Sequence, residues 1–197
     1  MNHPALSEQF VTRLFRSRKW LRRYGLELTR TSLGMHLWML FKELDIDIVI
    51  DVGARHGEYG LWLRRNGYDG WIHSFEPVAE SFRALTVRSA TDDRWIVHPM
   101  ALGSQGGQSD INVAEGSVFS SFLEPNAYAS ETFGSSPEVV ATETVQVGTL
   151  DEVFEGLVGR VGDPQVYLKL DTQGWDLEVL RGGSQSLPQV LALQTEI

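Results

Sequence analysis

The 197-residue sequence contains no cysteine. This absence excludes a disulfide-stapled scaffold, a zinc site built on thiolates and a cysteine nucleophile. The sequence also lacks any apolar run that approaches the ~18–20 residues of a membrane-spanning helix. Charged residues interrupt the first thirty positions, where a secretory signal would need an apolar core. We therefore expect a cytoplasmic protein with no membrane span.

Basic residues are scarce over most of the chain. Residues 43–197 hold nine Lys or Arg against 24 Asp or Glu, whereas residues 1–42 hold eight basic residues against two acidic ones. Nucleic-acid grooves need clustered Lys and Arg to contact phosphates, so we expect no nucleic-acid partner. An acidic body accepts a cationic ligand more readily than a polyanion. The five histidines lack the paired spacing of metal ligands, and we expect no metal site.

The residues that are present predict a folded chain in two segments. Hydrophobic residues make up 42% and charged residues 22%, which is typical of a globular protein with a full core. We expect an N-terminal helical extension over residues 1–45, with helices at 6–19 and 32–44, and a main domain over residues 46–197. The basic run at 16–23 would suit an anionic membrane surface or an acidic partner. A solvated helix face packed on the main domain is the simpler interpretation.

Strands and helices alternate from residue 46 onward. The run at 46–52 is short, nearly continuous and rich in β-branched residues, which predicts a strand buried on both faces of a parallel sheet, and a helical pattern follows it. The predicted buried strands cover residues 46–52, 71–75, 95–99 and 166–170, and a last one begins at residue 190. Two more strands, at 110–114 and 142–147, flank a long stretch rich in Gly, Ser and Pro. This alternation indicates an α/β fold with a doubly wound, mostly parallel, Rossmann-like sheet.

A glycine-rich segment, Asp51-Val-Gly53-Ala54-Arg55-His56-Gly57, follows the first predicted strand. Glycines at such a place allow a sharp turn and a close approach of the backbone to a ligand. The dinucleotide fingerprint G-x-G-x-x-G requires a glycine where this chain has Asp51. A carboxylate there would repel a pyrophosphate but can hold an ammonium group or hydroxyls. This pattern favours S-adenosylmethionine over NAD, and a plain strand-to-helix turn is the alternative.

Two further acidic residues follow predicted strands. Glu76 comes 25 residues after Asp51, where an acidic side chain can accept hydrogen bonds from ribose hydroxyls. A surface glutamate before a proline turn is the alternative. Asp171 follows the strand at 166–170 and could orient the cofactor's methyl end or take a proton from an acceptor hydroxyl. A helix-capping role for Asp171 is equally compatible with the sequence.

Six motifs stand in order along the chain: Asp51-Val-Gly-Ala…Gly57, Ser74-Phe-Glu76-Pro77, Ala101-Leu-Gly103, Ser117…Ser120-Ser121, Thr149-Leu-Asp151 and Lys169-Leu-Asp171-Thr-Gln-Gly174 with Val179-Leu-Arg-Gly-Gly. Together they resemble the FkbM family of S-adenosylmethionine-dependent methyltransferases. The resemblance covers about three quarters of the chain, from residue 48 to the C-terminus. It implies a class I methyltransferase fold that acts mostly on hydroxyl groups of sugars, glycans or polyketide-like metabolites.

The resemblance also implies roles for individual residues. Asp51, Gly53 and Gly57 would line the methionine end of the cofactor, Glu76 the ribose, and Ala101 and Leu102 the adenine, with Ala54, Arg55 and Pro77 as further cofactor contacts. The candidate substrate contacts are Ser120, Ser121 and His56, although a solvent-facing loop position is the simpler interpretation of His56. The candidate catalytic residues are Asp171 and Glu196.

Three features depart from the family pattern. Arg55 stands where the family usually has Asn, and Trp175-Asp176 replaces a commoner aromatic-Glu or Ala-Glu pair. The chain stops at Ile197, where family members usually continue with a final antiparallel strand pair. We therefore expect the C-terminal strands of the sheet to be missing.

The sequence predicts an S-adenosylmethionine-dependent O-methyltransferase for a hydroxyl of a sugar, glycan or related small metabolite. Two alternatives stay open. One is a non-catalytic cofactor-binding or interaction module, which the missing strands would suit. The other is an NAD-linked oxidoreductase, which the position of Asp51 disfavours. A homodimer is compatible with the sequence but is not specified by it.

Overall fold

The computed structural model describes residues 33–114 and 139–195. The chain divides into two compact units, residues 1–40 and 41–197. In the first unit the described part is the beginning of helix α3 (Leu33–Glu43), which agrees with the helix predicted at 32–44. The helix predicted at 6–19 lies outside the described residues.

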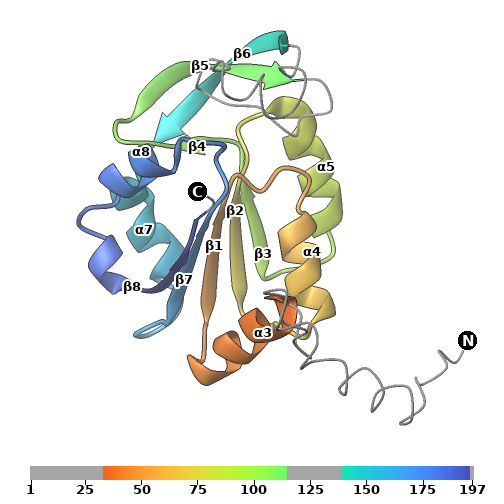
Figure 1. The fold of residues 1–197 in the computed structure, drawn as a ribbon, viewed down its shortest axis with the longest axis vertical. Coiled ribbons are helices and arrows are strands. Elements are labelled where there is room, and N and C mark those ends of the chain that lie inside the picture. Colours follow the sequence, from red (N-terminus) through yellow and green to blue (C-terminus); the bar gives the residue numbers. More distant parts are fainter. Residues whose placement is uncertain (1–32, 115–138, 196–197) are drawn as a thin grey trace, which may run out of the picture. The chain divides into compact units, whose positions relative to one another are not determined.

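A five-stranded parallel sheet forms the centre of the second unit (Figure 1). Its strand order is β3-β2-β1-β7-β8. The strands are β1 (Ile48–Val52), β2 (Trp71–Phe75), β3 (Trp95–His98), β7 (Val166–Leu170) and β8 (Val190–Gln194). Every residue of β1 and β7 is buried, because helices cover both faces of the sheet. This arrangement confirms the predicted doubly wound, mostly parallel α/β fold.

Helices pack on the two faces of this sheet. Figure 1 shows α4 (Glu58–Arg65) and α5 (Ala79–Ser89) on one side, and α7 (Leu150–Val158) and α8 (Asp176–Arg181) on the other. The main hydrophobic core joins the sheet to α7 and α8 through Leu150, Phe154, Leu157 and Val179. A 3₁₀ turn, η2 (Leu187–Gln189), leads into β8.

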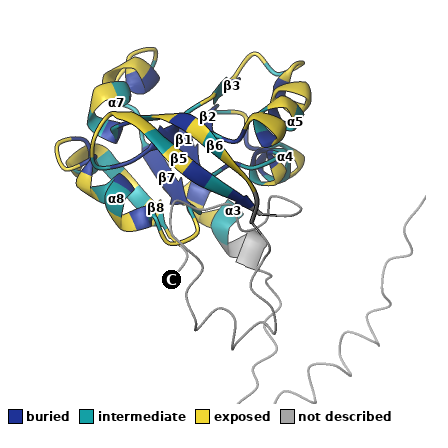
Figure 2. Cartoon of the chain, turned by 90° about the horizontal axis from the view of Figure 1, so that it is seen from above, coloured by how far each residue is buried: buried dark blue, intermediate teal, exposed yellow. Residues whose placement is uncertain are grey.

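A second sheet departs from the sequence prediction. Strands β4 (Ala101–Leu102), β5 (Gly107–Ala114) and β6 (Val139–Gly148) form a separate three-stranded sheet in the order β4-β6-β5. The strands predicted at 110–114 and 142–147 are therefore parts of a longer antiparallel hairpin, which crosses over the main sheet in Figure 2. Its own small core contains Val78, Ile111, Val113 and Val145.

The order of the strands reverses at β1. The chain runs outward from β1 to β2 and β3, and then returns to place β7 on the other side of β1. In open α/β sheets, ligands bind in the crevice outside the carboxyl ends of the strands at such a reversal. We therefore expect a ligand site among the residues that follow β1, β2 and β7.

Candidate active site at the carboxyl edge of the sheet

The loop after β1 passes directly against the loop after β7. Gly53 has φ +80°, and a Cβ at this position would lie 2.0 Å from the carbonyl oxygen of Asp171. Only glycine combines this left-handed conformation with so close a backbone approach. Gly57, with φ +83°, is the N-cap of α4, and a Cβ there would lie 2.7 Å from Leu85 Cδ1. Both glycines of the predicted cofactor loop thus have structural reasons to be glycine.

Asp51 lies inside the sheet and not on the surface of the loop. Its side chain is fully buried, and its register partners on the two neighbouring strands are Ser74 and Lys169. Lys169 Nζ donates to Asp51 Oδ1 at 3.1 Å, and Ser74 Oγ donates to Oδ2 at 3.4 Å. The negative charge that the sequence argument assigned to a ligand ammonium is therefore already balanced by a lysine of the protein.

Lys169 lies between two carboxylates. Its Nζ is 3.1 Å from Asp51 and 3.3 Å from Asp171, and it stands 5.1 Å from the centre of the Tyr59 ring. Burial lowers the pKa of Lys169, but the charges of Asp51 and Asp171 outweigh burial and raise the pKa above its ordinary value. Lys169 is therefore a buried permanent cation at the point where β1 and β7 meet.

Asp171 is the partly exposed member of this group. Its side chain is 28% exposed, and its Oδ1 accepts a hydrogen bond of 3.0 Å from Gln173 Nε2. Helix α8 begins at Asp176 with Trp175 as its N-cap, and Asp176 Oδ1 accepts from the backbone N–H of Thr172. Asp171 does not cap the helix, so the capping alternative raised by the sequence is wrong.

Glu76 follows β2 at the same edge of the sheet. Its carboxylate is almost completely buried and accepts backbone N–H groups from Arg55 at 2.8 Å and from Val78 at 2.9 Å. Burial raises the pKa of Glu76 to about 7, although these two hydrogen bonds act in the opposite direction. Glu76 therefore ties the loop after β1 to the start of α5 and titrates near neutral pH.

The other predicted site residues are distributed around this edge. Ala54, Ala101 and Leu102 are buried, and Pro77 is half-buried. His56 Nδ1 lies 3.5 Å from Glu58 Oε1. Ser120, Ser121 and Glu196 lie outside the described residues. The structure thus brings together Asp51, Gly53, Glu76 and Asp171 at the carboxyl ends of three neighbouring strands, β1, β2 and β7.

Sequence reasoning missed the role of Lys169. The signal was present, since Lys169 and Asp171 are two residues apart on a strand and therefore face the same way. A lysine within an otherwise apolar buried strand also requires a carboxylate partner.

A contact between the buried His73 and the half-buried His98 was also missed. Nδ1 of His73 lies 3.2 Å from Nε2 of His98. Burial, as the larger cause, and the nearby His98, as the second, lower the pKa of His73 to about 4.

In the part of the chain that the structure describes, no group of three or more His, Cys, Asp or Glu side chains could hold a metal ion. Within the same residues, no helix has the length and apolarity needed to cross a membrane.

Two solved structures are similar to this chain at low scores. A putative caffeoyl-CoA O-methyltransferase from Staphylococcus aureus has a TM-score of 0.43 and 8% sequence identity, over 92% of this chain and 67% of that one. The S-adenosylhomocysteine-bound methyltransferase PaMTH1 from Podospora anserina has a TM-score of 0.29 and 11% identity, over 50% and 52% of the two chains. Neither likeness bears on the activity of this chain.

Sequence comparisons are more informative. Hexuronic acid methyltransferase AglP from Haloferax volcanii is 28% identical over 163 residues, which are 81% of this chain and 59% of the relative. This chain therefore spans well under two thirds of that protein's length. The family model of the methyltransferase FkbM domain matches residues 51–196 of this chain. This range includes all of β2, β3, β7 and β8 and the last two residues of β1. The chain belongs to the FkbM family of methyltransferases.

Proposed function

We propose that this protein transfers a methyl group from S-adenosylmethionine to a hydroxyl oxygen of a sugar-like acceptor. Membership of the family makes the chain a methyltransferase and implies S-adenosylmethionine as its cofactor. The observation that carries the proposal of O-methylation is the partly exposed carboxylate of Asp171, held by Lys169 and Gln173 at the reversal point of the sheet.

The residues at the carboxyl edge fit this cofactor. Each oxygen of Glu76 accepts one backbone N–H and keeps a further lone pair, so the carboxylate can still accept two ribose hydroxyls. The buried Ala101 and Leu102 would supply an apolar wall for adenine. The loop that contains Gly53, Ala54, Arg55 and Gly57 would hold the methionine end, with Pro77 beside the ribose.

Asp51 supports this loop from inside the sheet. Because its charge is paired with Lys169, we assign it an indirect part in cofactor binding through the lysine and the backbone of the loop. S-adenosylmethionine supplies an activated methyl group when it is bound. The protein's main contribution is then alignment of the acceptor oxygen, which can be worth ~7–11 kcal/mol of the barrier.

Asp171 is the proposed catalytic residue nearest the acceptor. Its carboxylate can hold the acceptor hydroxyl through a hydrogen bond and accept its proton, which typically contributes 10²–10⁴-fold. Lys169 Nζ lies 3.3 Å from Asp171 Oδ2 and Gln173 Nε2 donates to Oδ1, so both oxygens of this partly exposed carboxylate are held in place. Glu196 as a second catalytic residue, and His56, Ser120 and Ser121 as substrate contacts, stay predictions.

The name of AglP supports a sugar-type acceptor. The alternative of a non-catalytic module differs from this proposal in one measurable respect, which is turnover. The experiment is single-turnover methyl transfer from S-adenosylmethionine to a set of hydroxylated saccharide acceptors, in the wild type and in Asp171→Asn. We expect Asp171→Asn to keep its affinity for S-adenosylhomocysteine and to lose about 10²-fold or more in rate.

A matched control separates this effect from a general loss of charge. Asp93 is exposed and precedes β3, at the opposite edge of the sheet, so Asp93→Asn should transfer methyl groups at the wild-type rate. Full activity in Asp171→Asn would remove Asp171 from the reaction. No transfer by the wild type to any hydroxylated acceptor, with S-adenosylmethionine bound, would favour the non-catalytic module.

A further inference from the structure

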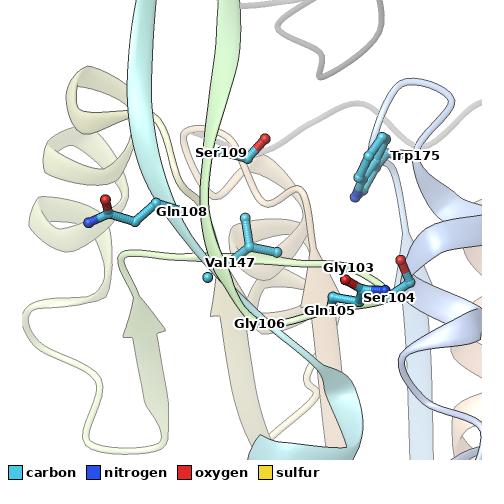
Figure 3. A pocket seen from close by; sticks show the side chains of 9 residues that line it. Gly103, Ser104, Gln105, Gly106, Gln108, Ser109, Val147 and Trp175 are labelled. Atoms are coloured by element: carbon cyan, nitrogen blue, oxygen red, sulfur yellow. The ribbon is translucent and has the colours of Figure 1, made fainter.

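A pocket of ≈ 390 Å³ opens beside the carboxyl edge of the main sheet (Figure 3). The Trp175 ring lies on one side, and Ser109 and Val147 at the base of the β5–β6 hairpin lie on the other. The remaining lining comes from the loop between β4 and β5, which contributes Gly103, Ser104, Gln105 and Gly106, and from Gly107 and Gln108.

The short loop from Asp171 to Trp175, between β7 and α8, connects the proposed active site to the pocket. At the start of this loop, the carbonyl of Asp171 lies against Gly53 of the cofactor loop. At the end of the loop, Trp175 lies against Gly103, where a Cβ would be 3.2 Å from Trp175 Nε1. Gly103 directly follows Ala101 and Leu102, the proposed adenine wall. Two residues of the lining, Trp175 and Gly103, thus connect the pocket along the chain to Asp171 and to the proposed adenine wall.

The lining combines an aromatic ring with neutral polar groups. An indole face offers apolar contact to the C–H face of a pyranose ring. The side-chain amides of Gln105 and Gln108 and the hydroxyl of Ser109 can each donate and accept hydrogen bonds, as sugar hydroxyls require. The Ser104 hydroxyl, which donates to Glu178, can accept one. An aromatic wall with a few polar groups is the usual composition of a small-molecule site.

The charges around the pocket are acidic. Ser104 Oγ donates to Glu178 Oε2 at 2.5 Å, and this hydrogen bond, together with Arg181, lowers the pKa of Glu178 and keeps it ionised. A Cβ at Gly106 would lie 3.3 Å from Glu152 Oε2. The nine lining residues include no Lys, Arg or His, and Arg181 is engaged by Glu178. A carboxylate ligand would meet like charge here, with no cation in the lining to receive it.

We propose that this pocket binds the saccharide ring of the methyl acceptor and selects a neutral hexose over a hexuronate. This inference rests on the proposed function and adds that the acceptor is uncharged. It also separates this chain from AglP, whose name specifies a hexuronic acid. A neutral sugar can satisfy the amides and hydroxyls of the lining, whereas a hexuronate would in addition place its carboxylate near Glu152 and Glu178.

The test compares p-nitrophenyl β-glucoside with p-nitrophenyl β-glucuronide, which differ only in the oxidation of C6. Binding of each to the full chain, in the presence of S-adenosylhomocysteine, is measured by saturation-transfer NMR, and methyl transfer is measured in parallel. We expect the glucoside to bind at least about tenfold more tightly. Trp175→Leu should weaken glucoside binding about tenfold, Trp175→Phe should restore most of it, and both should keep the wild-type affinity for S-adenosylhomocysteine.

A gain-of-function variant tests the charge argument independently of folding. Gln105→Arg adds a cation to the exposed lining and should shift the preference toward the glucuronide by about tenfold. Gln146→Arg makes the same change at an exposed position of β6 outside the lining and should not shift it.

The outcomes distinguish the inference from the proposed function. A wild type that methylates sugars but prefers the glucuronide overturns the inference and leaves the function standing. Loss of S-adenosylhomocysteine binding in Trp175→Leu would assign the pocket to the cofactor and also overturn it. A wild type that binds S-adenosylhomocysteine but methylates no hydroxyl acceptor overturns both.

Discussion

At the scale of single residues, the site is organised around a charge inside the sheet. Asp51 is completely buried, and its partner Lys169 is only 7% exposed. The desolvation of both ions opposes their attraction, so the pair itself need not stabilise the fold. Breaking the pair is different, because one buried charge would then have no counterion.

Removal of the lysine should therefore be costly. We expect Lys169→Met to lower the free energy of unfolding by about 3–5 kcal/mol, because Asp51 would keep a buried, unpaired charge. Urea unfolding followed by circular dichroism measures this change. Asp51→Asn combined with Lys169→Met should recover part of the loss.

A surface pair provides the matched control. Arg181 is 59% exposed and pairs with Glu178, so Arg181→Met should cost less than about 1 kcal/mol. If Lys169→Met and Arg181→Met lowered the free energy of unfolding equally, Lys169 would not be needed as the counterion of the buried Asp51.

Glu76 should make stability depend on pH. Burial raises the pKa of Glu76 from 4.5 to about 7 in the folded protein. The folded state therefore holds this proton over a pH range in which the unfolded state has released it. Its contribution is fully present below about pH 4.5, declines as the pH rises, and is lost above about pH 7, a total of about 3 kcal/mol.

The difference in unfolding free energy between the wild type and Glu76→Gln isolates this contribution from that of other titrating groups. His73, for example, has a lowered pKa and acts with the opposite sign, since its stabilisation is lost as the pH falls from about 6.5 to about 4. If the difference in unfolding free energy between the wild type and Glu76→Gln were constant from pH 4 to pH 8, it would contradict a raised pKa for Glu76. Glu80→Gln, at an exposed position of α5, should leave the profile unchanged.

At the scale of elements, the site depends on the contact between two loops. The loop after β1 and the loop after β7 touch at Gly53 and Asp171, and this contact fixes the backbone from which the Asp171 side chain projects. The hydrogen bond from the Asp171 N–H to the carbonyl of Val52, at 3.0 Å, continues the pairing of the strands up to this point.

A methyl group at Gly53 should disrupt this contact. Gly53→Ala places a Cβ 2.0 Å from a backbone oxygen and forces alanine to adopt φ +80°. We expect a loss of about 3 kcal/mol or more in unfolding free energy, from the strained φ and the displaced loop together. Thermal unfolding measures the loss.

Gly67→Ala is the control that separates the cost of the left-handed φ from the cost of the steric contact. It has φ +85°, but nothing lies within 4 Å of a Cβ placed there. Gly67→Ala should therefore show the conformational cost alone, about 1 kcal/mol. If Gly53→Ala were no more destabilising than Gly67→Ala, the two loops would not be in the close contact described.

The sequence predicted most elements because their signals are local. The β-branched run of β1, the mostly apolar run of β7 and the Gly182-Gly183 end of α8 are properties of a few consecutive residues. It did not predict that β5 and β6 leave the main sheet, because pairing between distant strands is set by tertiary contacts. Nor did it predict that Asp51 faces Lys169, since that contact depends on the register between two strands 118 residues apart.

At the scale of the whole molecule, the reversal of strand order explains why residues distant in sequence form one site. Motifs after β1, β2 and β7 meet because parallel strands present their carboxyl ends at one edge. The order of the motifs along the chain was therefore sufficient to predict the edge on which the site lies. The position of each side chain at that edge required the structure.

The central claim is that this edge binds S-adenosylmethionine and not a dinucleotide. The most direct measurement is a pair of calorimetric titrations of the full chain, one with S-adenosylhomocysteine and one with NAD. We predict micromolar affinity for S-adenosylhomocysteine, a tenfold to hundredfold loss of that affinity in Glu76→Gln, and no heat with NAD. Binding of NAD, or undiminished binding of S-adenosylhomocysteine in Glu76→Gln, would contradict the account.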